Sequence, residues 1–276
     1  MSYKKILTIQ DISCLGQCSL TVALPILSAC GMETCIIPSA ILSTHTAGFE
    51  GYTFRDLTDD IPKIEAHWQK EKVSFEAIYT GYLGSTKQID YVLDIFKNLG
   101  APNCLNIVDP AMADNGKLYP AFDEAYVEEM KVLCQKADII LPNITEACFL
   151  TGEAYKTNYD EAYILQLLQK LQRTSGQVVV LTGVGYRPGY TGVVVYQDGK
   201  MDYYEHKFLD PGCHGTGDVY ASAFVGALMR GKSAFEAAKV AANYTLACIE
   251  HTRGDKDHWY GVKFEEKLPL LIELLD

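Results

Sequence analysis

The stretch Cys-His-Gly-Thr-Gly-Asp, from Cys213 to Asp218, stands directly before a run of small and apolar residues that is typical of a buried helix. Backbone amides beside glycines at the start of a helix can bind phosphate oxygens, because no side chain obstructs them and the helix adds a partial positive charge. We therefore expect Gly215, Thr216 and Gly217 to form an anion hole. Asp218 follows at once, where a carboxylate can either cap the helix or take a proton from an attacking hydroxyl group.

A second polar segment runs from Asp109 to Tyr119 and leaves an apolar stretch through an acid and a proline. Asn115-Gly116 within it is a turn signal, so the segment can be an ordinary loop in which Asp109 is a solvated strand end. The alternative is a carboxylate that contacts a metal ion or a phosphate. Mg²⁺ prefers oxygen ligands and keeps several waters, so one or two carboxylates are enough to hold it.

Asn143 and Glu146 form a third candidate, at the end of another apolar stretch. An N-cap asparagine followed three residues later by glutamate resembles a capping box, which stabilises a helix and needs no chemistry. The two side chains can serve that purpose and still face a ligand, so both interpretations stay open.

The composition argues against several classes of function. The formal net charge is −11 and no stripe of Lys and Arg stands out, so the electrostatic footprint of a nucleic-acid binder is missing. No stretch approaches the roughly 20 apolar residues of a membrane span, and the N-terminal apolar run meets Asp11 too early for a signal peptide.

The nine cysteines have no CxxC spacing and the six histidines are scattered. We expect no metal held by Cys or His, and reduced thiols in a cytoplasmic protein.

The elements that must position these residues follow from the apolar pattern. Helical patterns cover residues 86–100 and 125–137, the second with one side made of Val127, Met130, Val132, Leu133 and Cys134. Stretches rich in Ile, Val and Leu predict strands at 5–10, 34–38, 76–80, 104–109, 138–143 and 177–183. Alternating strands and helices predict an α/β fold, a three-layer α/β/α sandwich around a mostly parallel sheet, because crossovers join parallel strands and both faces need cover. We expect one domain over residues 1–276, with ligands beyond the carboxyl ends of the strands.

The last third of the chain changes pattern. Asp198-Gly199 lies between alternating residues and predicts a β-hairpin. Long helices are then expected at about residues 217–230 and 233–252.

Taken together, the motifs resemble those of the ribokinase-like superfamily, and within it the kinases of vitamin B6, which act on pyridoxal, pyridoxine and pyridoxamine. The resemblance spans about residues 5 to 250. In chain order the motifs are Ile9-Gln10, Thr44-His45-Thr46, Gly81-Tyr82, Val108-Asp109-Pro110, Asp114-Asn115-Gly116-Lys117-Leu118-Tyr119, Asn143-x-x-Glu146 and Gly215-Thr216-Gly217-Asp218.

This resemblance implies a sandwich that transfers a phosphoryl group from ATP, with Mg²⁺, to the 5′-hydroxymethyl group of a B6 vitamer. It implies Asp218 as the base and the amides of Gly215, Thr216 and Gly217 as the anion hole. Phosphoryl transfer needs positioning and charge neutralisation more than covalent chemistry, so this residue set is consistent with the reaction.

Further roles are implied by the same resemblance. Asp109 and Glu146 would work around the Mg²⁺ ion and its waters. The nucleotide phosphates would be bordered by Asn143, Thr182 and Thr216. The vitamer would be contacted by Asp11, His45, Thr46, Tyr82, Cys213, His214 and Asp218. A homodimer is implied as well, and the need for a monovalent cation stays open.

Some residues depart from the family pattern. Asp11 stands where many members have serine, and an acid there could accept from the pyridine nitrogen or from the amine of pyridoxamine. Leu141 stands where threonine is frequent, which could alter a nucleotide contact. Cys213 and His214 are either plain loop residues, or Cys213 traps an aldehyde substrate and His214 shuttles a proton or touches a phosphate.

Two alternatives remain. Hydroxymethylpyrimidine kinases share this fold, but they usually carry Gly-Gly-Ala-Gly after the first strand and often a cysteine in place of Asp218, whereas residues 13–19 here read Ser-Cys-Leu-Gly-Gln-Cys-Ser. A catalytically silent vitamin-binding protein is the other. The presence of Asp218 argues against it, because a binder gains nothing from a base that faces the γ-phosphate.

Overall fold

The computed structural model describes residues 3–209 and 213–276. Its main sheet consists of β1 (Lys5–Ser13), β2 (Glu33–Leu42), β3 (Phe54–Asp56), β4 (Phe75–Thr80), β5 (Gly100–Val108), β8 (Ile139–Ile140), β9 (Val178–Thr182), β10 (Tyr190–Gln197) and β11 (Lys200–Lys207). The strands lie in the order β11-β10-β9-β8-β5-β4-β1-β2-β3. Strands β2, β1, β4, β5, β8 and β9 are parallel, while β3 at one edge and β10 and β11 at the other pair antiparallel.

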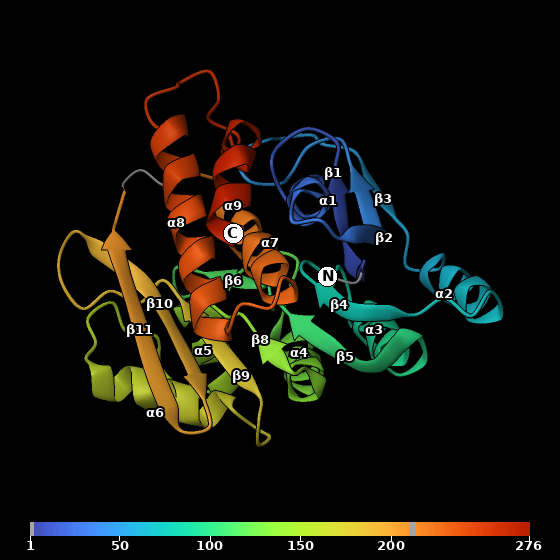
Figure 1. Ribbon diagram of the computed structural model, residues 1–276, viewed down its shortest axis with the longest axis horizontal. Helices are drawn as coiled ribbons and strands as arrows, with labels where there is room; N and C mark the ends of the chain where they lie inside the picture. The colour runs from blue at the N-terminus through green and yellow to red at the C-terminus, as the bar shows by residue number, and fades with distance from the viewer. Residues whose placement is uncertain (1–2, 210–212) are drawn as a thin grey trace.

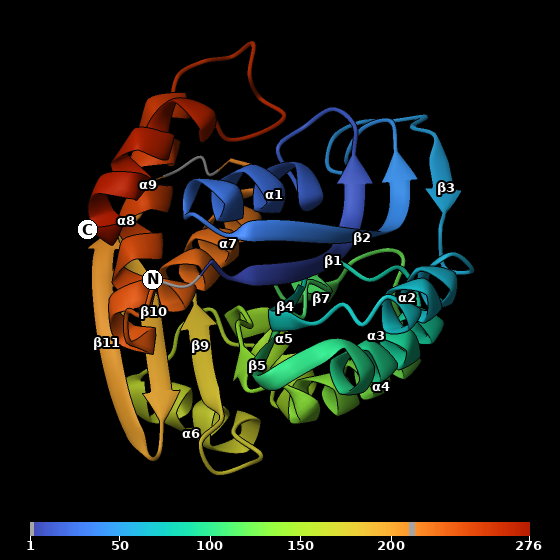
Figure 2. The same cartoon turned by 45° about the vertical axis from the view of Figure 1, so that its right-hand side comes forward.

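Helices cover both faces of this sheet (Figure 1). They are α1 (Leu20–Ala29), α2 (Ile61–Lys70), α3 (Thr86–Leu99), α4 (Glu124–Lys136), α5 (Ile144–Thr151), α6 (Glu161–Leu171), α7 (Thr216–Met229), α8 (Ala234–Thr252) and α9 (Leu268–Leu275), with a 3-10 turn at Glu265–Lys267. One hydrophobic core lies between the sheet and α2 to α6, and a second lies between the sheet and α1, α7, α8 and α9 (Figure 2). The expected three-layer α/β/α sandwich is confirmed.

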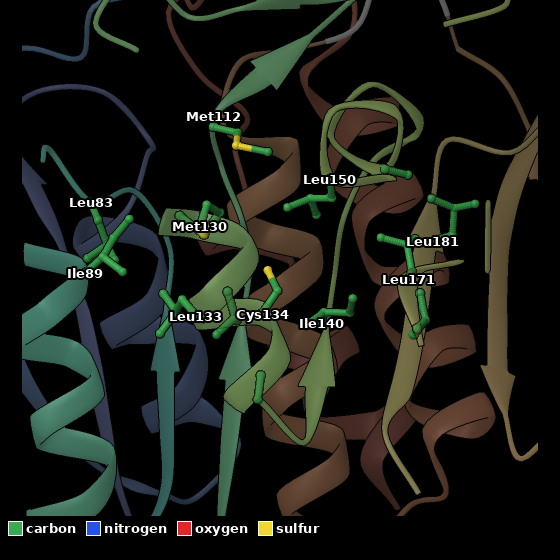
Figure 3. Packing of buried hydrophobic residues seen from close by; sticks show 14 of the residues in the cluster. Leu83, Ile89, Met112, Met130, Leu133, Cys134, Ile140, Leu150, Leu171 and Leu181 are labelled. Atoms are coloured by element: carbon green, nitrogen blue, oxygen red, sulfur yellow. The ribbon is translucent and has the colours of Figure 1, made fainter. Parts of the chain in front are cut away.

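The central strands supply both cores because successive side chains point to opposite faces. In β9, Val178 and Val180 join the core beneath α7 and α8, whereas Val179 and Leu181 join the core beneath α2 to α6. Figure 3 shows the core beneath α2 to α6, where side chains of α3, α4, α5 and α6 meet those of the strands. A sheet buried on both faces accounts for the nearly continuous apolar stretches in the sequence.

Two expectations about these elements need correction. The stretch 138–143 contains only two residues of strand, Ile139 and Ile140. Pro142 has no N–H to extend the ladder, and the next residue already caps a helix. Val132 is 39% exposed and does not share the buried side of α4. It lies five positions after Val127, which turns it about 140° around the helix, away from the buried stripe.

The two turn signals both form hairpins. Asp198 and Gly199 connect β10 to β11 with φ angles of 51° and 80°, which confirms the predicted hairpin. Asn115 and Gly116, with φ angles of 51° and 77°, connect the short strands β6 (Ala113–Asp114) and β7 (Lys117–Leu118). This small hairpin follows β5 and therefore lies at the carboxyl edge of the main sheet.

The candidate residues gather at that edge. The parallel strands β1, β4, β5, β8 and β9 all end there, each followed by a polar or glycine-containing segment. Within the described residues, none of the helices has both the length and the apolar character that crossing a membrane would require.

Candidate active site

The glycine segment lies at the N-terminus of α7, which begins at Thr216. Gly215 precedes the helix with a φ of +79°, in the left-handed region. A Cβ on Gly215 would come within 1.7 Å of the carbonyl oxygen of Gln17, so only glycine permits this approach of two backbones. A Cβ on Gly217 would meet nothing within 4 Å. The start of the helix is therefore open beside a tightly packed turn, an arrangement that can present backbone amides to an anion.

Asp218 lies in the first turn of α7 but does not cap it. The N-cap is Gly215, without a side-chain hydrogen bond, so the capping interpretation is wrong. Burial raises the pKa of Asp218 to about 7; a hydrogen bond from the backbone amide of Ser19 opposes this rise, and the charge of Asp11 adds to it. A carboxyl group that is about half ionised at neutral pH suits a general base.

Asp11 is a buried acid near the end of β1, and its side chain is only 5% exposed. Burial raises the pKa of Asp11, while hydrogen bonds from the hydroxyls of Ser19 and Ser13 oppose the rise; the Ser13 bond is 3.1 Å long. Burial raises the pKa of Tyr82 to about 12, and the charge of Asp11 adds to it. Because Asp11 acts electrostatically on both Asp218 and Tyr82, these three residues share one region.

The motifs Ile9-Gln10 and Gly81-Tyr82 meet at the ends of β1 and β4. A Cβ on Gly81 would come within 2.6 Å of Gln10 Oε1, so the glutamine side chain packs directly on the glycine backbone. Gln10 Nε2 also donates to Thr8 Oγ1 at 2.9 Å. Glycine at 81 therefore lets Gln10 stay buried directly beside the residue that precedes Tyr82.

Asp109 and Glu146 form an acidic cluster with Asp218. Burial raises the pKa of Asp109 well above its usual range, and the charges of Glu146 and Asp218 add to this. Burial also raises the pKa of Glu146 to about 7, against hydrogen bonds from backbone amides. Carboxyl groups gathered in one desolvated place create a negative potential that a cation would relieve. Two carboxylates supply the oxygen ligands that Mg²⁺ prefers. Among the described residues, no group of three or more His, Cys, Asp or Glu side chains could hold a metal ion.

The predicted capping box at α5 is confirmed. Asn143 Oδ1 accepts from the amide of Glu146 at 2.9 Å, and Glu146 Oε2 accepts from the amide of Asn143 at 2.8 Å. Asn143 Nδ2 donates to the carbonyl of Ala113 at 2.9 Å, and Glu146 Oε1 accepts from the amide of Met112 at 3.1 Å. The pair therefore ties the start of α5 to the β6–β7 hairpin and to the residue before it, and backbone amides hold the Glu146 carboxylate in place.

Thr182 and Thr145 lie beside this capping box. Thr182 forms an isolated parallel bridge with Asn143, and its amide donates to the carbonyl of Pro142 at 3.0 Å. Thr145, a residue without a predicted role, accepts from the amide of Gly116 at 3.0 Å and so fixes the β6–β7 hairpin on α5. A threonine within the first turn of the helix gave no separate signal in the sequence.

Tyr119 is a second residue to which sequence reasoning assigned no role. It ends the Asp-Asn-Gly-Lys-Leu-Tyr motif, and its pKa is raised by burial and then by the charges of Glu146, Asp114, Asp109 and Asp218. The motif can be recognised in the sequence, but only the folded structure shows that its last residue, Tyr119, lies near the acidic cluster.

Three further residues that the resemblance assigned to the vitamer are His45, Thr46 and His214. His45 is buried, Thr46 is exposed, and the rings of His45 and His214 lie 5.5 Å apart, so the fold brings together two histidines far apart in sequence. His45 Nδ1 accepts from the amide of Ala47 at 3.2 Å, and Nε2 donates to the carbonyl of Tyr260. Both ring nitrogens are thereby engaged by the protein, which leaves the ring carbons for contact with a substrate.

Cys213 and His214 directly precede Gly215, the N-cap of α7. Burial raises the pKa of the Cys213 thiol, which disfavours the nucleophilic thiolate. Burial lowers the pKa of His214, and the nearby His45 adds to this. A neutral imidazole is therefore expected here at neutral pH, able to accept or donate a hydrogen bond.

Comparisons with known proteins show the family to which the chain belongs. A family model described as phosphomethylpyrimidine kinase matches residues 24–261. A Bacteroides thetaiotaomicron protein named as a phosphomethylpyrimidine kinase, in a crystal form with pyridoxal, is 40% identical, with a TM-score of 0.91 and coverage of 98% of this chain and 96% of that one. Pyridoxal kinase from Lactobacillus plantarum is 31% identical, with a TM-score of 0.92 and coverage of 99% and 98%.

A curated relative is also a pyridoxal kinase. Pyridoxal kinase of Dictyostelium discoideum is 29% identical over 239 residues, covering 80% of this chain and 77% of the relative. The resemblance inferred from the motifs is confirmed. Because the family model matches most of the chain, the chain belongs to the phosphomethylpyrimidine kinase family, and it is a phosphotransferase acting on a hydroxyl group, of the vitamin B6 kinase branch of the ribokinase-like superfamily.

Proposed function

We propose that this protein transfers the γ-phosphoryl group of ATP to the 5′-hydroxymethyl group of pyridoxal, pyridoxine or pyridoxamine. One observation carries the proposal: Asp218, whose pKa burial raises to about 7, directly follows the glycine turn at the start of α7 and lies near the buried Asp11. The pyridoxal in the similar Bacteroides crystal supports the choice of acceptor.

In the proposed reaction Asp218 takes the proton from the acceptor hydroxyl as the hydroxyl oxygen attacks the γ-phosphorus. The bond between the γ-phosphorus and the β–γ bridging oxygen breaks, and ADP leaves. The amides of Gly215, Thr216 and Gly217 stabilise the negative charge on the transferred group. The tight contact of Gly215 with Gln17 holds these amides in place before substrate binds. Preorganised donors cost no rearrangement during the reaction, which is the reason such holes accelerate phosphoryl transfer.

Asp109 and Glu146 are the proposed residues for Mg²⁺. A bound Mg²⁺ would neutralise charge on the nucleotide phosphates. Waters and phosphate oxygens would complete its ligands, because the described side chains alone do not form a metal site. Thr182, Asn143 and Thr216 are proposed to border the phosphates, with Asn143 acting mainly through the backbone that its capping bonds fix.

The vitamer is proposed to lie between the ends of β1, β2 and β4. Asp11 would accept from the ring nitrogen or from the amine of pyridoxamine, and Tyr82 and Thr46 would line the ring. His45 and His214 would close the side nearest the anion hole, where His214 could contact a phosphate. The raised pKa of Cys213 favours its alternative as a loop residue over the trapping of an aldehyde.

Hydroxymethylpyrimidine is the alternative acceptor, and the name of the matching family favours keeping it. The silent binding protein is the weaker alternative, because a desolvated carboxylate beside an anion hole is costly unless it accepts a proton. Product analysis separates the three. With ATP, Mg²⁺ and pyridoxine, the account expects a phosphate ester on the 5′-hydroxymethyl group by NMR; no ester on any vitamer would refute it.

The assembly and the boundaries of the protein are proposals too. An apolar patch, consisting of Ile41, Tyr52 and Phe54, lies at the β3 edge of the sheet, and these side chains are 38%, 40% and 54% exposed. Edge strands with exposed apolar side chains are prone to pair with another chain. We propose that this edge patch is buried in a homodimer and that residues 1–276 act as one kinase domain.

Dependence on a monovalent cation is settled by comparing rates in K⁺, Na⁺ and choline buffers.

A further inference from the structure

The loop after β2, residues 44–52, has little backbone support. No backbone-to-backbone hydrogen bond joins it to another residue that the structure describes, and the nearest such bond is between Ser43 and Thr53 at its ends. Among the described residues, the only hydrogen bond that a main-chain amide of this loop donates is the one from Ala47 to His45 Nδ1. A loop with so few hydrogen bonds takes its conformation from the side chains that pack on it.

The side chains that pack on this loop come from the segment between α8 and α9. The carbonyl of Tyr260 accepts from His45 Nε2, across 215 positions of sequence. The ring of Trp259 lies 4.8 Å from that of Phe49, and a Cβ on Gly48 would come within 2.9 Å of Trp259 Cζ3. In Figure 2 this segment, in red, reaches over toward the blue loops after β1 and β2.

The same segment also contacts the turn that supports the anion hole. A Cβ on Gly261 would come within 3.0 Å of the backbone nitrogen of Gln17, the residue whose carbonyl packs on Gly215. On the other side of the loop, the ring of His45 lies 5.5 Å from that of His214. The segment between α8 and α9 therefore contacts two places: the loop of residues 44–52, here called the acceptor loop, and the turn at Gln17 that packs on Gly215.

We propose that residues 258–260 form a clamp on the acceptor loop, and that Trp259 is a positioning residue that fixes residues 44–52 at the active site. The proposal rests on the proposed function, because the loop matters for activity only if Thr46 and His45 lie at the vitamer. Trp259 acts through Phe49 and Gly48, and it does not itself contact the vitamer. A loosened loop must be ordered again by each substrate molecule, which weakens acceptor binding and leaves the nucleotide side unchanged.

Proteolysis of the full-length protein without substrates tests the clamp directly. Glutamyl endopeptidase can cleave after Glu50, inside the loop, and mass spectrometry of the fragments identifies that cut. We expect Trp259→Ala to speed cleavage at Glu50 by up to about tenfold, the range that loss of an aromatic pair allows. Trp259→Phe should restore most of the protection. Ile272→Ala is the matched control, because Ile272 on α9 is 48% exposed and Trp259 is 49% exposed.

Steady-state kinetics gives the second readout. Trp259→Ala should raise the KM of the vitamer by about the same factor, with kcat and the KM of ATP changed by less than about twofold. A raised vitamer KM without faster cleavage at Glu50 would mean that Trp259 contacts the substrate itself, and would overturn the clamp. Unchanged cleavage with unchanged KM would overturn it as well. If no vitamer is phosphorylated at all, the proposed function fails, but cleavage at Glu50 still decides whether the clamp exists.

Discussion

The carbonyl oxygen of Gln17 occupies the position from which a side chain on Gly215 would project, only 1.7 Å from the ideal Cβ. Gly215 also has a φ of +79°, so space and backbone conformation impose the same requirement. The loop after β1 and the start of α7 are thus packed together at a glycine, and we expect the proposed anion hole to depend on that contact.

Gly215→Ala should therefore lower the free energy of unfolding by more than a glycine substitution usually does. We expect a lower Tm and a loss of kcat/KM of about 100-fold or more, the effect of misplacing an oxyanion donor. Thermal unfolding and initial rates measure the two. Gly217→Ala is the stability control, because a Cβ there meets nothing within 4 Å, so its Tm should stay at the wild-type value. Equal activity of Gly215→Ala and wild type would contradict the assignment of the anion hole.

Asp218→Asn tests the base, because the amide keeps the size of the side chain but cannot take the proton. We expect kcat to fall by about 100- to 10,000-fold. In wild type, kcat/KM should fall as the pH drops below about 7, where Asp218 becomes protonated, and this acid limb should be absent from the residual activity of the variant. Asp94→Asn, at an exposed position of α3, is the control. An unchanged pH profile would rule Asp218 out as the base.

Asp109→Asn should increase stability while it lowers activity. Burial and the charges of Glu146 and Asp218 raise the pKa of Asp109 in the folded state, so its ionisation destabilises the native protein: the stability present at low pH is lost as the pH rises toward the folded pKa. Asparagine cannot ionise, so without metal the variant should melt higher than wild type at pH 8, by about 2 to 4 °C for each kcal/mol recovered. The difference should shrink toward pH 4. Activity should need more Mg²⁺; an unchanged Mg²⁺ requirement would argue against Asp109 as a metal residue.

Phe54→Asp tests the proposed dimer. The edge patch of Ile41, Tyr52 and Phe54 is apolar and exposed in the single chain, and a charge at its centre should be costly to bury in an interface. Sedimentation equilibrium should give twice the monomer mass for wild type and the monomer mass for the variant. Tyr3→Asp, at an exposed aromatic residue outside the patch, should leave the wild-type mass unchanged. A monomeric wild type, or a dimeric Phe54→Asp, would contradict the interface.

Much of the fold could be predicted because local patterns and burial agree. The apolar stretches alternate with helical ones, so the three-layer sandwich follows before any motif is considered. The capping box of Asn143 and Glu146 was also readable, because both partners lie within one helical turn. The short β8 was not predicted, because the apolar stretch continues through Leu141 and Pro142, and an apolar pattern by itself indicates a longer strand.

The site was less predictable where its properties arise from distant contacts. The sequence indicated Asp218, but its pKa depends on burial and on Asp11, which lies on the first strand. Nothing in the sequence connected Trp259 and Tyr260 with the loop that carries His45, because these segments are 215 positions apart for the His45–Tyr260 pair and meet through isolated aromatic contacts. Isolated contacts of this kind produce no regular spacing of residue types in the sequence.

The central claim is the identity of the acceptor, and a panel of kcat/KM values tests it most directly. Pyridoxal, pyridoxine, pyridoxamine and hydroxymethylpyrimidine would each be assayed with ATP and Mg²⁺ under identical conditions. We predict that kcat/KM for at least one B6 vitamer exceeds that for hydroxymethylpyrimidine by about tenfold or more, the scale on which a pocket discriminates related substrates. An equal or higher value for hydroxymethylpyrimidine would contradict it.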